Sequence, residues 1–297
     1  MQRILAPLDG SAMAEAALPA ITYFASRSGA TVVLLHVLEQ RAPATRHGDR
    51  HLTAAAEADR YLAALAERLR ADGLTVETHV HDSPQGNLAR SLADHADELQ
   101  ADLIALCSHG DDRLRNLLWG SVAQQVLSHG RQPVLLVPPR MPDTAKWQLQ
   151  SILVPLDGTP AHEPALAPAQ DLARLTGARL ELLLVIATSR TLRPNRAATG
   201  VWLPITTKAI LELAAQGGQE YLTGLVAACQ AAGLPAEGRV LRGDAADELL
   251  AAERQNADLM VMATHGRRGL DAWLEHSVAP RVTEKAQCPL LLVRAEE

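Results

Sequence analysis

The feature that most constrains the fold is a repeat inside the chain. The segment "ILAPLDGS" at 4–11 returns as "ILVPLDGT" at 152–159, and "ADLIALCSHG" at 101–110 returns as "ADLMVMATHG" at 257–266. A third segment, "QPVLLV" at 132–137, returns as "CPLLLV" at 288–293. A period of about 150 residues has the size of a domain. We therefore predict two copies of one domain, at 1–140 and 150–297, joined by the proline-containing linker "PPRMPDTAKWQLQ" at 138–150.

Each half alternates short apolar runs with longer helical stretches. In the first half the expected strands are 2–7, 31–37, 75–80, 102–107 and 133–137. Continuous apolar runs indicate strands covered on both faces, and alternating strands and helices indicate a parallel sheet with right-handed crossovers. The predicted fold class is α/β: two repeated doubly wound domains, each a five-stranded parallel sheet flanked by helices. Pro7 and Pro155 sit awkwardly in this scheme, because a central strand rarely tolerates proline. We expect both at the carboxyl end of their strand.

Composition excludes several classes of protein. A net charge of -6 and few aromatic residues argue against nucleic-acid binding. The three cysteines are widely spaced and match neither a disulfide framework nor a zinc site, so we expect a reducing compartment. The N-terminus lacks the pattern of a signal peptide, and the apolar runs are too short to cross a bilayer. These features predict a cytoplasmic protein without membrane insertion.

The loops after the strands are the candidate binding site. In an open α/β sheet, ligands lie outside the carboxyl ends of the strands. Glycines let a backbone approach a ligand closely, and the free N–H groups at a helix start favour an anion. A carboxylate there can accept hydrogen bonds from a ribose or an adenine. In the first half the residues concerned are Asp9-Gly10-Ser11 after the first strand, His109-Gly110 after the fourth, and Gly120, Ser121 and Val122 at the start of the last helix.

The repeated motifs resemble those of the universal stress protein family in its tandem two-domain form. That family's nucleotide motif reads glycine, two residues, glycine, nine residues, glycine, then serine or threonine. The first half has Cys107 in place of the first glycine and keeps Gly110 and Gly120-Ser121. The second half has Ala263 in place of the first glycine, keeps Gly266, and has His276-Ser277 in place of the last pair.

The resemblance implies a fold, a ligand and a way of assembling. The ligand would be ATP or another adenine nucleotide, with or without Mg²⁺. The fifth strands, 133–137 and 289–293, would associate and join the halves as an intrachain pseudo-dimer, within a homo-oligomer such as a homodimer. The implied nucleotide-binding residues are Asp9, Val37, Cys107, His109, Gly110, Gly120, Ser121 and Val122 in the first half, and Asp157, Val185, Ala263, His265, Gly266, Ser277 and Val278 in the second.

Departures from the motif lead us to predict that the first half holds the better-preserved site. Cys107 and Ala263 add only a small side chain, whereas His276 is large enough to occupy the phosphate space. Pro280 removes a backbone donor from the following helix. Arg267 and Arg268 add positive charge there, and Asp111 and Asp112 in the first half would repel phosphates unless they bind a metal or face solvent.

Simpler interpretations stand beside these. The glycine loops could be tight turns without a ligand, Asp9 and Asp157 could cap helices, and His109 and His265 could bond the loop backbone. Cys107 could be a redox sensor, although a buried small side chain is the preferred interpretation. His79 and His81 lie on one strand face and, with His47 and His51, hint at a metal site. No fixed spacing supports that site, so we predict exposed histidines and no metal.

The sequence contains no catalytic constellation. It has neither the lysine-containing phosphate loop nor the nucleophile elbow of hydrolases, so we predict no catalytic residue and at most slow ATP hydrolysis. The leading hypothesis is an adenine-nucleotide-binding regulatory protein of the stress response with an unknown protein partner. The alternatives are an interaction protein that binds no nucleotide and acts through dimerisation, and a slow ATP hydrolase. The long segment 187–208, with Trp202, is expected to cover the second pocket or to contact a partner.

Overall fold

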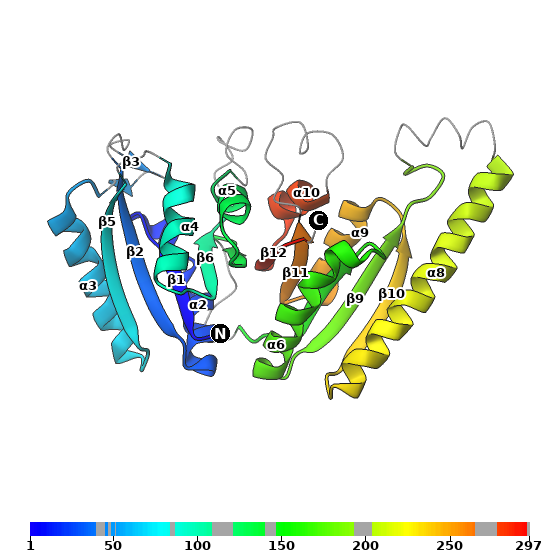
Figure 1. Ribbon diagram of the computed structural model, residues 1–297, viewed down its shortest axis with the longest axis horizontal. Coiled ribbons are helices and arrows are strands. Elements are labelled where there is room, and N and C mark those ends of the chain that lie inside the picture. The colour runs from blue at the N-terminus through cyan, green and yellow to red at the C-terminus, as the bar shows by residue number, and fades with distance from the viewer. Residues whose placement is uncertain are drawn as a thin grey trace. The chain divides into compact units, whose positions relative to one another are not determined.

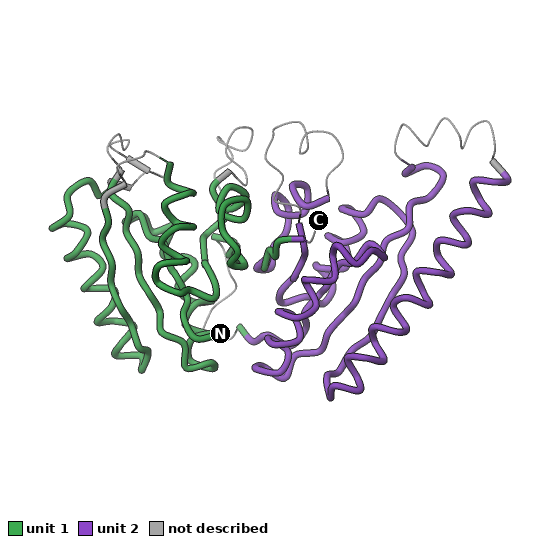
Figure 2. The backbone as a smooth tube through the Cα atoms, viewed as in Figure 1, with its two compact units in different colours: residues 1–147, 291–294 green, residues 148–290, 295–297 purple. Residues whose placement is uncertain are grey.

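The chain forms two compact units. The computed structural model describes residues 1–39, 45–46, 49–50, 52–83, 87–108, 121–139, 147–192, 204–264 and 278–295. Unit 1 comprises residues 1–147 and 291–294, and unit 2 comprises residues 148–290 and 295–297 (Figure 2). Both units are built from parallel strands and flanking helices, so the predicted α/β class with two repeated domains is confirmed (Figure 1).

Unit 1 contains a parallel sheet with strand order β7-β6-β1-β2-β5. Its strands are β1 (Arg3–Pro7), β2 (Thr31–Glu39), β5 (Val76–Ser83), β6 (Leu103–Cys107) and β7 (Val134–Val137). Its helices are α1 (Ala12–Glu15), α2 (Leu18–Ser28), α3 (Ala55–Ala71), α4 (Leu88–Glu98) and α5 (Ser121–His129). The predicted strands agree with these to within a few residues. A short antiparallel pair, β3 (Thr45–Arg46) and β4 (Asp49–Arg50), was not predicted.

The core of unit 1 lies between the sheet and its helices. Ile4 and Leu34 in the strands have no exposed surface, and Phe24 of α2 is 1% exposed. Helix α3 buries Ala58, Leu62, Leu65 and Leu69, whose spacing places them on one face of a helix. Burying each large apolar side chain contributes roughly 1.5–3 kcal/mol before the entropic cost of folding is subtracted. The apolar stripe of the sequence is therefore what attaches α3 to the sheet.

Unit 2 repeats this arrangement, with strand order β10-β9-β8-β11. Its strands are β8 (Ser151–Leu156), β9 (Arg179–Ile186), β10 (Ala236–Arg242), β11 (Leu259–Thr264) and β12 (Leu290–Arg294), of which residues 291–294 group with unit 1. Its helices are the 3-10 helix η1 (Pro160–Ala165), α6 (Leu166–Thr176), α8 (Pro204–Ala231), α9 (Ala245–Asn256) and α10 (Val278–Lys285). Helix α8 has 28 residues, whereas α3 at the same place in unit 1 has 17.

One repeated aspartate has a structural role in each unit. Asp102 Oδ2 accepts hydrogen bonds from the backbone N–H groups of Gln2 and Arg3, the latter at 3.0 Å. Asp258 Oδ2 accepts the same two bonds from Gln150 and Ser151, at 2.9 and 3.0 Å. These bonds attach the start of β6 to the start of β1 in unit 1, and the start of β11 to the start of β8 in unit 2. The repeated "ADL" sequence is thus explained by strand alignment and not by ligand binding.

The two prolines mark the places where central strands separate. The register between β1 and β6 pairs Ile4 and Leu5, and that between β8 and β11 pairs Ile152 and Leu153. Pro7 and Pro155 follow two residues later in each case. A proline costs no ladder hydrogen bond where the neighbouring strand has diverged. As predicted, both lie near the carboxyl end of their strand, and there the sheet opens at the point where its strand order reverses.

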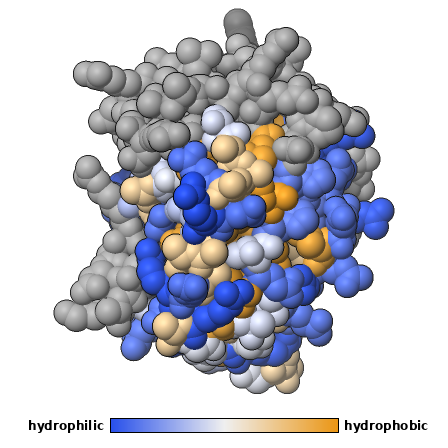
Figure 3. All heavy atoms as spheres, turned by 90° about the vertical axis from the view of Figure 1, so that its left-hand side faces the viewer, coloured by the Kyte–Doolittle hydropathy of each residue, from blue (hydrophilic) through white to orange (hydrophobic). Residues whose placement is uncertain are grey.

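Within the described part of the chain, no helix is both long and apolar enough to span a bilayer. Figure 3, which faces the left-hand side of Figure 1, shows mostly hydrophilic side chains with smaller apolar areas between them. All three cysteines, Cys107, Cys229 and Cys288, are free thiols. This agrees with the prediction of no disulfide framework.

Candidate functional site

Asp9 lies two residues after the end of β1, where the sheet of unit 1 opens. Its Oδ1 atom accepts hydrogen bonds from the Ser11 N–H at 3.0 Å and from the Ser11 hydroxyl at 2.6 Å. The Ser11 Oγ in turn accepts from the Ala14 N–H at 3.1 Å and caps α1. The alternative that Asp9 itself caps this helix is therefore wrong. Asp9 orients the capping serine through one carboxylate oxygen, and its carboxylate is held at the carboxyl edge of the sheet.

Asp157 occupies the same position in unit 2. Its Oδ1 accepts from the N–H and hydroxyl of Thr159, at 2.9 and 2.7 Å, as Asp9 does from Ser11. Its Oδ2 lies 2.9 Å from Nδ1 of His162. In the aligned repeat the residue at the position of His162 is Ala14, which has no polar side chain. A ligand of Asp157 would therefore compete with His162 for the carboxylate.

The apolar residues implied by the family resemblance lie at the carboxyl ends of the strands. Val37 near the end of β2 is 6% exposed, and Val185 near the end of β9 is half-buried. Cys107 is the last residue of β6, and Ala263 is buried near the end of β11. Helix α5 begins at Ser121, as predicted, so Val122 lies in its first turn, and Val278 is the first residue of α10.

Cys107 lies near Asp9. Burial, with a smaller contribution from the Asp9 carboxylate, raises the pKa of the Cys107 thiol to about 12. The thiol is therefore protonated at neutral pH, and reactive cysteines need a lowered pKa. Cys107 is half-buried, and its protonated thiol favours a small packed side chain over a redox sensor.

The phosphate-binding half of the predicted site lies outside the described residues. This applies to His109, Gly110, Gly120, His265, Gly266 and Ser277, and to the side chain of Ser121. It applies equally to the charged residues Asp111, Asp112, Arg267 and Arg268, to His276, and to His47 and His51. The described part of the predicted site is its carboxylate and apolar side, with Asp9 near Cys107 and with Val37 near the carboxyl end of the adjacent strand β2.

A tyrosine–glutamate pair, which was not predicted from the sequence, lies near the aspartate of each unit. The Tyr61 hydroxyl of α3 donates to Glu15 Oε1 of α1 at 3.2 Å, and the Tyr221 hydroxyl of α8 donates to Glu163 Oε1 of η1 at 3.0 Å. Burial raises the pKa of both tyrosines, so both hydroxyls remain donors. Glu15 and Glu163 hold the same position in the PLDG repeat, which was the available signal.

The sequence-based prediction that the histidines of β5 are exposed is only partly right. His81 is exposed, but His79 is half-buried, and His95 of α4 is 4% exposed. Their rings gather, with centroids 4.3 to 5.9 Å apart. Burial, followed by the neighbouring His95 and His81, lowers the pKa of His79. His95 was missed because only the packing of α4 on the sheet brings it to β5.

The glycine after each aspartate gives a testable difference between the units. Gly10 and Gly158 both have positive φ, +90° and +82°. A Cβ on Gly10 would lie 2.7 Å from Cγ of Leu52, whereas one on Gly158 would meet nothing closer than Cδ1 of Leu184 at 3.5 Å. Both alanine variants incur a backbone cost of about 1–2 kcal/mol, and Gly10→Ala adds about 1–3 kcal/mol for the clash.

Urea unfolding of the two glycine variants measures this difference. We expect Gly10→Ala to be the less stable, and a shift of Leu52 would also disturb the loop beside Asp9. Equal losses in the two variants would show that Leu52 moves aside at no cost.

Arg281 anchors the helix that follows the second glycine loop. Its guanidinium donates to Asp244, the N-cap of α9, at 2.9 Å and to Asp247 at 2.8 Å. The Arg281 hydrogen bond lowers the pKa of Asp244. A lowered pKa stabilises the fold above the unfolded pKa of about 3.9, and the contribution is lost as the pH falls through the folded pKa.

Two substitutions of Asp244 separate the cap from the ion pair. We expect Asp244→Ala to lose about 1 kcal/mol of stability, because it removes both. Asparagine is also a good N-cap, so Asp244→Asn should lose only the stability that the ion pair with Arg281 contributes and that acid removes. Thermal unfolding between pH 7 and pH 3 checks this. The difference in stability between the wild type and Asp244→Asn should shrink toward pH 3. A difference that stays constant would contradict a stabilising ion pair between Asp244 and Arg281.

The two units, each an open parallel sheet with a carboxylate where its central strands part, define a tandem α/β protein. The Universal stress protein family profile matches residues 1–138 and 148–294. The chain therefore belongs to the universal stress protein family, with two copies of the domain in tandem, as the sequence motifs predicted.

Individual relatives agree with this. A universal stress protein of Mycolicibacterium smegmatis is 29% identical over 301 residues, covering 98% of this chain and 96% of the relative. One from Methanocaldococcus jannaschii is 32% identical over 146 residues, or 49% of this chain and 82% of the relative. The crystal structure of a universal stress protein from Archaeoglobus fulgidus superposes with a TM-score of 0.71 at 17% identity, covering 99% of this chain and 97% of the other. That likeness concerns the fold alone.

Proposed function

We propose that the protein binds an adenine nucleotide in unit 1 and acts as a nucleotide-responsive regulator in a stress response. The observation that carries the proposal is the position of Asp9, at the split between the central strands and oriented by Ser11. A carboxylate there accepts hydrogen bonds from ribose hydroxyls or an adenine amine. Val37, near the carboxyl end of the adjacent strand β2, places an apolar side chain at the same edge, as a nucleoside site needs. Binding at this edge follows the general rule for open α/β sheets.

Unit 1 is the better candidate on the motif, because His276 stands in unit 2 where the family motif has its last glycine. In unit 2 both oxygens of Asp157 have partners within the unit, Thr159 and His162. A nucleotide binding to unit 2 would have to displace the His162 contact. The tyrosine–glutamate pairs stabilise the first helical turn after the aspartate in both units, so they do not distinguish the two.

Calorimetric titration of ATP, AMP and cyclic AMP into the nucleotide-free chain tests the proposal. We expect one site per chain, an unchanged affinity in Asp157→Ala, and a signal with at least one of the three ligands. Titrations with and without Mg²⁺ show whether the ion contributes to binding. Single-turnover phosphate release should be slow, since no catalytic group is predicted. If none of the three ligands gave heat or a shift in Tm, the nucleotide proposal would be wrong.

A second candidate function is interaction through dimerisation. Helix α8 exposes Ile205, Ile210 and Leu213, which are 85%, 58% and 67% exposed, at the end of the long segment 187–208. Residues 193–203 of that segment, with Trp202, lie outside the described residues. Exposed large apolar side chains on one helix favour a protein partner. The pairing of the two fifth strands, by contrast, stays a prediction from the family resemblance.

Sedimentation of the full chain distinguishes this function from nucleotide regulation. If the α8 surface mediates dimerisation, the double variant Ile210→Ser, Leu213→Ser should weaken self-association and leave nucleotide binding unchanged. Self-association that is equally strong in the variant would exclude this surface.

A further inference from the structure

Three histidines of unit 1 form a cluster outside the nucleotide site. His79 and His81 belong to β5, the last strand in the sheet order of this unit, and His95 belongs to α4. One nitrogen from each ring lies within 4.8 Å of the other two. Residues on one face of a strand and one helix therefore bring three imidazole nitrogens together.

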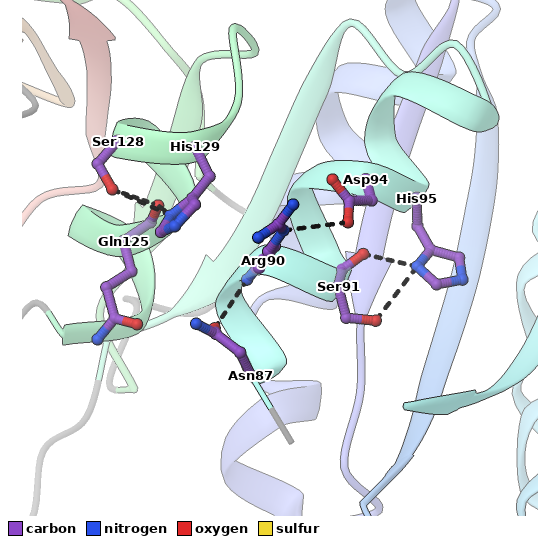
Figure 4. Close-up of polar contacts among 8 residues, drawn as sticks. All are labelled: Asn87, Arg90, Ser91, Asp94, His95, Gln125, Ser128 and His129. Atoms are coloured by element: carbon purple, nitrogen blue, oxygen red, sulfur yellow. Dashed lines mark hydrogen bonds and ion pairs between the residues drawn. The ribbon is translucent and has the colours of Figure 1, made fainter. Parts of the chain in front are cut away.

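The hydrogen bonds of His95 involve Nδ1 and leave Nε2 available as a ligand atom. Nδ1 lies 2.6 Å from the Ser91 carbonyl oxygen and 3.4 Å from the Ser91 hydroxyl (Figure 4). A contact with a carbonyl requires the proton on Nδ1, so Nε2 carries the lone pair. This is the tautomer that histidine ligands of metals adopt when Nδ1–H bonds a backbone carbonyl.

Two of the three rings present a buried nitrogen without a partner. Nε2 of His95 and Nε2 of His79 are both buried and make no hydrogen bond within the described part of the chain. The His95 side chain is almost fully buried, at 4% exposure. Buried polar atoms usually have partners, so two unpaired nitrogens in one cluster indicate a missing ligand. A ligand that accepts lone pairs from several neutral imidazoles is a transition-metal cation.

We propose that His79, His81 and His95 bind one divalent transition-metal ion, with Zn²⁺ as the best-matched common ion. Zn²⁺ takes imidazole nitrogens at about 2.0–2.1 Å in tetrahedral geometry, which places ligand atoms about 3.3 Å apart. The three nitrogens must therefore approach one another by at most about 1.5 Å. The exposed His81, on an edge strand, has the freedom to do so, and water completes the coordination.

Unit 2 provides an internal control, because its described residues at the equivalent positions are not histidines. The sheet register places Arg239 and Leu241 of β10 opposite Leu183 and Val185, where β5 has His79 and His81 opposite Leu35 and Val37. Counted from the helix caps Asn87 and Asp244, the residue equivalent to His95 is Ala252. Arg239 forms an ion pair with the buried Glu181 instead. The expected stoichiometry is therefore one ion per chain.

Zinc titration of the full chain, purified without a histidine tag and freed of nucleotide, tests this. We expect calorimetry to show one Zn²⁺ per chain, and both His81→Gln and His95→Gln to weaken binding at least tenfold. His129→Gln is the matched control, since His129 Nδ1 makes the same contact with a helix carbonyl, Gln125 O at 2.6 Å, but is exposed on α5 (Figure 4). Its affinity should stay within twofold of wild type.

The exposed position of His81 keeps the test independent of folding, because His81→Gln changes no buried group. Zn²⁺ should also raise the Tm of the wild type more than that of His81→Gln. The proposal would be overturned by the absence of saturable Zn²⁺ binding, or by binding that is equally strong in His81→Gln and His129→Gln. Neither outcome depends on whether unit 1 binds a nucleotide.

Discussion

Asp9→Ala is expected to weaken adenine-nucleotide binding by about 10- to 150-fold, the effect of losing a hydrogen bond to a charged group at about 1.5–3 kcal/mol. The carboxylate lies where the central strands of unit 1 separate, and Ser11 holds its orientation through two bonds to Oδ1. Asp157→Ala should change the affinity by less than about twofold, because the proposed site is in unit 1. Calorimetric titration of both variants measures the difference.

Ser11→Ala controls for damage to the local structure. It removes the hydroxyl that bonds Asp9 and caps α1, at a cost of about 1 kcal/mol in stability, but leaves the carboxylate in place. We expect its nucleotide affinity to fall much less than that of Asp9→Ala. If Ser11→Ala lost as much affinity, Asp9 would be acting through the turn and not on the ligand.

Cys107 should react with iodoacetamide roughly a thousandfold more slowly in the native protein than in the unfolded chain at pH 8. The thiolate is the reactive form, and the rise in pKa from 9.0 to about 12 reduces its fraction by about that factor. Because Asp9 contributes to the raised pKa, Asp9→Asn should accelerate alkylation. Peptide mapping of the alkylated protein by mass spectrometry separates Cys107 from Cys229 and Cys288.

The raised pKa of the Cys107 thiol also predicts how the stability of the fold changes with pH. A raised pKa means that the folded state holds the proton more tightly, so this contribution is complete below the unfolded pKa of 9.0 and is lost as the pH rises toward about 12. Cys107→Ser should show a flatter loss of stability across that range. Native alkylation as fast as in the unfolded chain, together with identical pH profiles, would contradict a protonated and protected Cys107.

The fold was predictable from the sequence because its main signals are local and repeated. Continuous apolar runs mark the buried parallel strands, and the two copies support each other's assignment. The pair β3 and β4 could not be predicted, because two-residue strands contain no periodic pattern. The role of Asp102 also required the structure, since its bonds to Gln2 and Arg3 join segments about one hundred residues apart.

The candidate site was predictable in part for the same reason. Parallel strands place their carboxyl ends at one edge, so the position of Asp9 follows from the strand assignments, whereas Val37 and Cys107 were implied by the family resemblance. The contact between His162 and Oδ2 of Asp157 did not follow, because it depends on the His162 side chain reaching back to the end of the strand. The cluster of His79, His81 and His95 likewise depends on the packing of α4 against the sheet. Contacts between distant segments have no periodic signature in a sequence.

Mass spectrometry of the small molecules released from freshly purified, denatured protein tests the central claim most directly. We predict about one adenine nucleotide per chain, which disappears in Asp9→Ala and persists in Asp157→Ala. Two nucleotides per chain would show that unit 2 binds despite the His162 contact. No nucleotide, together with no binding of ATP, AMP or cyclic AMP by calorimetry, would contradict the account and favour dimerisation through α8.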